Sequence, residues 1–184
     1  MAINGSEARH ALAEIQSATD KSSALRAYAG AANYLIVWGA AWIAGGFAGL
    51  ISPALSQWGW SIAVAVAIAC SIVLGVRAQG APDSSGALIK IMLMTLMMAL
   101  VCAAISVVLD LPSLRAAFAL QALIISGLYM GYGVWRGARI FILGFALAGA
   151  VLVGWFYLRD QFELFLGVAG GALLIITGLW LRRA

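Results

Sequence analysis

Three charged residues, Arg159, Asp160 and Glu163, interrupt the apolar stretch GWFYLRDQFELFLG at positions 154–167. Charged groups held inside a membrane are costly and usually belong to a functional site, so an ion pair lining the mouth of a channel is one interpretation. The other is an external turn between two helices, in which Asp160 caps the second helix and Glu163 lies in its first turn. We prefer the turn, because the charges fall between two apolar runs of spanning length.

A second candidate for chemistry is the sulfur series Met94, Met98 and Cys102. These residues are four apart, so they lie along one face of a helix, and soft thioether and thiol groups are ligands suited to Cu(I). Methionine also fills irregular gaps in apolar packing. Packing is the preferred interpretation, because no further Met or Cys motif stands in a polar segment to load a metal. We therefore expect no metal and no cofactor.

The remaining ionisable residues argue against an enzyme. The single histidine, His10, lies in a polar N-terminal segment, and no Asp, Glu or His falls in the middle of an apolar run. No serine stands in a G-x-S-x-G pattern, and no phosphate-binding glycine pattern follows a strand. We predict a protein that is not an enzyme, with no catalytic residue.

The composition indicates that the solvent of this chain is a lipid bilayer. Of the 184 residues, 64% are hydrophobic and 10% are charged, with a mean hydropathy of +1.02. A soluble fold of this size keeps too much of its surface wet to hide so many apolar groups. The net charge of +4 is spread without a basic run, so no nucleic-acid partner is expected. Cys70 and Cys102 form neither a disulfide framework nor a metal-binding pair.

Six apolar segments have the length of a transmembrane helix, about 20 residues. They lie near residues 32–52, 58–76, 88–109, 114–135, 139–158 and 161–181. The predicted fold class is an all-α membrane protein with six transmembrane helices. Residues 1–28 form a polar leader, which is either a short interfacial helix or a solvated tail, and residues 29–184 form the transmembrane domain.

Lysine and arginine set the expected orientation, because they are enriched in cytoplasmic segments. With the N-terminus inside, the cytoplasmic side carries Arg9, Lys21, Arg26, Arg77, Lys90, Arg136, Arg139, Arg182 and Arg183. The opposite side carries only Arg115 and Arg159. We therefore predict that both termini are cytoplasmic (N-in/C-in); the inner (plasma) membrane of a bacterium as the location is what the family resemblance given below implies.

The spans also suggest three helical hairpins in tandem. The turn residues Pro53, Pro112 and Asp160 are each followed by an apolar span and then by an arginine. These arginines are Arg77, Arg136 and Arg182. A turn and a basic inner anchor are common to any hairpin, so the alternative is that the pattern is not a true repeat.

Uncharged polar residues inside the spans are the candidates for a pore lining or for contacts between helices. They are Gln121, Ser126, Tyr129, Asn33, Thr95 and Ser106. Small residues four apart predict close helix packing, and the pairs are Gly45/Gly49, Gly127/Gly131 and Gly167/Gly171. Tyr129, Tyr132 and Trp135 approach the inner membrane boundary and are interpreted as interfacial anchors.

From about residue 32 onward, the layout of small-residue-rich hairpins with closings such as LIITGLWLRR (174–183) resembles the bacterial acid-resistance membrane proteins of the HdeD type. That resemblance implies a small six-span inner-membrane protein linked to stress survival. Our leading hypothesis is a non-enzymatic multi-pass protein that acts in stress protection or as a subunit of a membrane complex. The alternative is a passive channel or facilitator for a small neutral solute. The expected partners are the lipid bilayer and either a second copy, giving a homo-oligomer, or another membrane protein.

Overall fold

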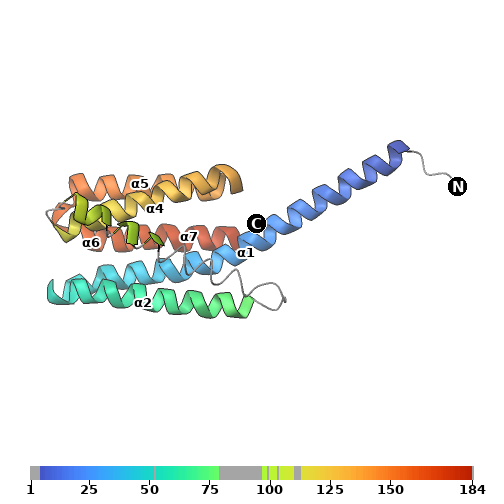
Figure 1. Cartoon of the computed structure of the whole chain (residues 1–184). Coiled ribbons are helices and arrows are strands. Elements are labelled where there is room, and N and C mark those ends of the chain that lie inside the picture. Colours follow the sequence, from blue (N-terminus) through green and yellow to red (C-terminus); the bar gives the residue numbers. More distant parts are fainter. Residues whose placement is uncertain are drawn as a thin grey trace.

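The computed structural model describes residues 5–51, 53–78, 97–98, 100–102, 104–109 and 113–183. Within these residues every regular element is a helix, which confirms the all-helical prediction (Figure 1). The elements are α1 (Gly5–Ile51), α2 (Pro53–Ala78), α4 (Leu114–Arg136), α5 (Ala138–Tyr157), the 3₁₀ turn η1 (Arg159–Gln161), α6 (Phe162–Phe165), the π-helical segment η2 (Leu166–Gly170) and α7 (Gly171–Arg182).

Among the described residues, five helices are long and apolar enough to cross a membrane, as a multi-pass membrane protein requires. Their bounds are Ala31–Ile51, Trp58–Arg77, Arg115–Trp135, Ala138–Tyr157 and Arg159–Arg182. Each matches a predicted span within a few residues. The remaining predicted span, 88–109, lies largely outside the described residues, although the described positions between 97 and 108 are helical.

Local chemistry explains where these helices begin and end. Pro53 opens α2, where its missing N–H leaves no helical bond unmade. The Ser113 hydroxyl caps α4 by accepting a hydrogen bond from the backbone N–H of Ala116 at 3.2 Å. Gly137 alone joins α4 to α5 and has φ 127°, a conformation that residues with a Cβ avoid. The single-residue connection forces α5 to double back along α4.

The turn before the last span differs from the prediction at Asp160. This residue lies inside η1, and the N-cap of α6 is Gln161, which makes no side-chain capping hydrogen bond. Asp160 is therefore not the cap of the last span, because an extra 3₁₀ turn separates it from the helix. Glu163 does lie in the first turn of α6, as expected.

The long helix α1 crosses the predicted boundary at residue 28/29 without a break. It contains 47 residues, which corresponds to about 70 Å at 1.5 Å per residue. Its first half extends away from the other helices (Figure 1), and Leu12 and Ile15 are 65% and 63% exposed there. From Gly5 onward the polar leader thus belongs to the same helix as the first span. Whether it lies in the interface or in water stays a prediction.

The closest helix packing lies along a seam between α1 and the last span. A Cβ on Gly39 would lie 2.6 Å from the carbonyl oxygen of Gly171, and a Cβ on Gly46 would lie 2.9 Å from Cα of Gly167. At the next level, a Cβ on Gly178 would lie 2.8 Å from the carbonyl oxygen of Ala32. We call the six residues of these contacts the glycine seam: Ala32, Gly39, Gly46, Gly167, Gly171 and Gly178. Along it, the backbones of α1 and the last span are in contact at three positions.

A second close contact joins α4 and α5. A Cβ on Gly144 would lie 2.6 Å from the carbonyl oxygen of Ser126, and one on Gly133 would collide with the backbone of Phe141. The last span then lies between the α4–α5 pair and the α1–α2 pair (Figure 1). Small residues thus set the helix spacing on both sides of the molecule.

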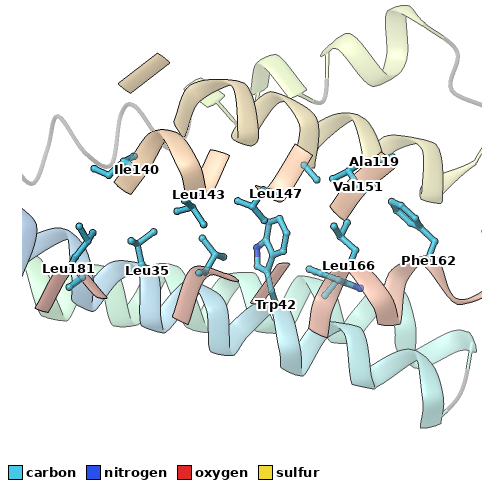
Figure 2. Close-up of a cluster of buried hydrophobic side chains, with 14 residues drawn as sticks. Leu35, Trp42, Ala119, Ile140, Leu143, Leu147, Val151, Phe162, Leu166 and Leu181 are labelled. Carbon is cyan, nitrogen blue, oxygen red and sulfur yellow. The ribbon is translucent and has the colours of Figure 1, made fainter. Parts of the chain in front are cut away.

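Large side chains fill the space between these layers. Leu143, Leu147, Val151 and Phe162 are each 1% exposed, and Figure 2 shows them in a row with Leu35, Trp42 and Leu166. At one level the core is aromatic. Trp42 and Trp60 have ring centroids 6.2 Å apart, and Trp60 and Phe118 have centroids 5.3 Å apart. This series links α1, α2 and α4 through edge and tilted ring contacts.

The glycine seam predicts that some glycines tolerate replacement by alanine much less well than others with the same sequence spacing. We expect Gly171→Ala to lower the free energy of unfolding by about 1–3 kcal/mol, because the added Cβ overpacks the contact with α1. Gly127→Ala is the matched control: Gly127 is exposed and no described atom lies within 4 Å of its Cβ position. Thermal unfolding of both variants in detergent, followed by circular dichroism, measures this. Equal midpoints would contradict the seam.

Candidate functional site

Two of the predicted polar residues that the structure describes, Ser126 and Ser106, are hydrogen-bonded within their own helices. Ser126 is fully buried, but its hydroxyl donates to the carbonyl oxygen of Ala122 in its own helix at 2.7 Å. Ser106 likewise donates to the carbonyl oxygen of Cys102 at 2.9 Å. Both hydroxyls are therefore satisfied locally and do not join helices. Thr95 lies outside the described residues.

Gln121 stands apart from Ser126 on α4. Five residues correspond to a rotation of about 140° around an α-helix, so the two side chains point to different faces. Gln121 is half-buried, and no hydrogen bond joins it to another described residue. The described helices thus do not assemble the shared polar face that a continuous aqueous pore would need.

Asn33 has a different role from the one expected of a pore residue. Its side-chain oxygen accepts a short hydrogen bond from Nη2 of Arg182, which ties the start of the α1 span to the end of α7. Nearby, Arg139 donates to the carbonyl oxygen of Trp180 at 3.3 Å and lies 5.0 Å from the centroid of its ring. We call this end of the molecule the arginine end; Arg77 and Arg183 lie there too (Figure 1).

A pocket of about 250 Å³ opens near the arginine end. Its described lining residues are Ala31, Tyr34, Leu35, Trp38, Tyr129, Tyr132 and Ile140. They come from α1, α4 and α5, and most of the lining is apolar. Tyr129 is thus a predicted polar residue that lines this pocket. We call it the aromatic pocket, because four of its seven lining residues carry aromatic rings.

Sequence patterns pointed to only part of this pocket. Tyr129 and Tyr132 were expected to be interfacial anchors, and Trp135 is indeed 88% exposed. No sequence pattern indicates that Tyr34 and Trp38, on another helix, line the same pocket as the two tyrosines. Pairing of α1 with α4 is a long-range property, so only the folded structure reveals the pocket.

The predicted packing glycines fall into two groups. Gly167 and Gly171 belong to the glycine seam, and a Cβ on Gly45 would lie 2.8 Å from the Trp60 ring. Gly49 is half-buried at the end of α1. Gly127 and Gly131 are exposed, and no described atom lies within 4 Å of their Cβ positions, so the expected contact at this pair is not present among the described residues.

The sulfur series is only partly within the described residues. Met94 lies outside them, Met98 is half-buried and Cys102 is buried. Among the residues that the structure describes, no group of three or more His, Cys, Asp or Glu side chains could hold a metal ion. Nothing in the described part of the chain therefore adds support to a copper site.

Comparison with protein families, with curated proteins and with solved structures found no match to this chain. The resemblance to the HdeD type therefore stays a prediction. What the structure itself defines is a class: an all-helical chain with several spans of membrane-crossing length, whose interior is closed by apolar side chains.

The local bonding of Ser126 predicts the effect of removing its hydroxyl. We expect Ser126→Ala to change the free energy of unfolding by less than about 1 kcal/mol, because the helix keeps all its backbone hydrogen bonds. Leu147→Ala, at a neighbouring core position that is 1% exposed, should lower it by about 2–5 kcal/mol through the cavity it leaves. Denaturant titration in detergent compares the two variants. A larger loss from Ser126→Ala would show that its hydroxyl joins helices.

Proposed function

We propose that this chain is a non-enzymatic multi-pass protein of a bacterial inner membrane, which acts as a packed helical subunit in an assembly with a second copy or another membrane protein. It has six spans in three tandem hairpins, with both termini in the cytoplasm. A role in stress survival, as the resemblance to the HdeD type implies, fits the same architecture.

The closed interior carries this proposal. Leu143, Leu147 and Phe162 fill the space between the helix layers, and the buried serine among them is bonded within its own helix. Such a core supports a rigid scaffold more directly than a conduit. Large apolar side chains such as Phe145, Phe156 and Trp135 are 67%, 72% and 88% exposed, which suits a surface that contacts lipid or protein.

The alternative function is a passive facilitator for a small neutral solute. The aromatic pocket favours it, because the tyrosines Tyr34 and Tyr129 are among its lining residues. Such groups could select an uncharged polar molecule without ionisable residues. A path through the rest of the molecule would have to pass the filled core.

The proposal predicts that the protein, extracted gently from its own membrane, travels in an assembly. Native mass spectrometry should give a mass above that of the 19.2 kDa chain, from either a homo-oligomer or a complex with another protein. A chain found only as a monomer would contradict the subunit role.

Solute flux separates the two functions in the same preparation. In liposomes containing the purified chain, we expect the efflux of small neutral solutes to equal that of empty vesicles. Flux above this level that Tyr129→Phe lowers would favour the facilitator and overturn the scaffold. Tyr157→Phe is a suitable control, since Tyr157 is 82% exposed at the far end of α5.

The six-span topology is tested by labelling single cysteines in a background with Cys70→Ala and Cys102→Ala. An even number of spans puts both termini on one side, so a membrane-impermeant maleimide should label Gln161→Cys in intact spheroplasts. It should label His10→Cys and Arg183→Cys only after permeabilisation. Labelling of His10→Cys and Arg183→Cys from opposite sides would show an odd number of spans.

A further inference from the structure

The aromatic pocket combines an apolar lining with the side chains of Tyr34 and Tyr129. Tyr34 and Tyr129 are half-buried, and neither hydroxyl forms a hydrogen bond to another described residue. Leu35, Trp38 and Ile140 supply most of the remaining surface. A ligand that fits this lining has an apolar body and oxygen atoms that accept hydrogen bonds at one end.

The charged groups around the pocket determine which sign of charge on a ligand is favourable there. Arg182 is bonded to the neutral amide of Asn33, and Arg139 is bonded to a backbone carbonyl, so neither arginine is neutralised by its described partner. Among the described residues from 31 onward, the only carboxylates are Asp160 and Glu163, at the opposite end. A cation in the aromatic pocket would meet uncompensated positive charge, whereas an anion would be attracted.

The position of the pocket limits the ligand further. Ala31 is the first residue of the α1 span, and Ile140 lies near the beginning of the α5 span. The pocket is therefore at the depth where the acyl chains of a lipid meet its headgroup. Its volume of about 250 Å³ suits part of one acyl chain and its glycerol, and does not suit a large soluble molecule.

We propose that the aromatic pocket binds one anionic phospholipid of the adjoining leaflet. The upper acyl chain and glycerol occupy the space between Trp38 and Tyr129, the tyrosine hydroxyls donate to ester oxygens, and the phosphate lies toward Arg139 and Arg182. The site adds to the scaffold function and does not depend on it.

The test is native mass spectrometry of the full chain titrated with phosphatidylglycerol or with phosphatidylcholine. We expect one phosphatidylglycerol to be retained in preference to phosphatidylcholine. Ala31→Leu, which fills the pocket, should lower this retention about tenfold, the equivalent of two buried methylenes. Ala40→Leu is the matched control, because Ala40 is exposed on the same helix and outside the lining.

A second matched pair of variants tests whether lipid binding requires the positive charge near the pocket. Arg139→Gln should lower the affinity for phosphatidylglycerol roughly fivefold, the effect of about one basic residue near an anionic lipid. Arg159→Gln is the control, because Arg159 lies over the Trp155 ring at 5.4 Å, much as Arg139 lies over Trp180, but at the opposite end. Phosphatidylcholine retention should not change with either variant.

Tyr129→Phe keeps the test decisive if Ala31→Leu disturbs folding, since it removes only a hydroxyl. We expect it to weaken phosphatidylglycerol retention while Tyr157→Phe does not. The proposal would be overturned if the two lipids were retained equally. It would also be overturned if Ala31→Leu and Ala40→Leu, folded to the same helix content, retained the same amount of phosphatidylglycerol.

Discussion

The contact between the backbones of α1 and the last span is the constraint on which the rest of the structure depends. Within lipid, apolar side chains gain little by leaving their surroundings, so helices associate through close packing and polar contacts. Gly39 and Gly171 provide that packing, because each lies where a Cβ would reach the other's carbonyl oxygen. The glycine seam brings α7 to a fixed depth, and the α4–α5 pair then covers its other side with Leu143 and Leu147.

This arrangement also explains how the interior and the aromatic pocket coexist. Where the seam holds the helices at their closest, leucine and phenylalanine side chains are enough to fill the core. Between α1 and α4 no small-residue contact is described, and large rings span the distance instead. At one level Trp60 and Phe118 touch; near the arginine end, Trp38 and Tyr129 leave the pocket between them.

Hydropathy and span length were sufficient to predict the all-helical fold and five described spans, because both follow directly from composition along the chain. The partners of each helix face were harder to predict. A search for glycines four apart found Gly167 and Gly171 but missed Gly39, Gly46 and Gly178. Gly39 and Gly46 follow Ala32 at intervals of seven residues, and Gly178 follows Gly171 at the same interval. The same search chose Gly127 and Gly131, since a motif does not show whether another helix faces it. Helical periodicity alone could have separated Gln121 from Ser126.

The continuity of α1 was not predicted from the sequence, for a different reason. A polar composition marks where the solvent changes from lipid to water, whereas a helix ends only where its hydrogen bonding is interrupted. The alanine-rich segment before residue 31 contains no proline, and its helical propensity lets the first span continue outward.

An uninterrupted helix transmits motion as a rigid lever. Because α1 contains no proline between Gly5 and Ile51, a sideways displacement of its outer half must tilt its inner half as well. Its inner half is one side of the glycine seam and one wall of the aromatic pocket. Anything that holds or displaces the first turns of α1 would therefore act mechanically on the packing inside the membrane, which begins about 40 Å away by the rise of the helix.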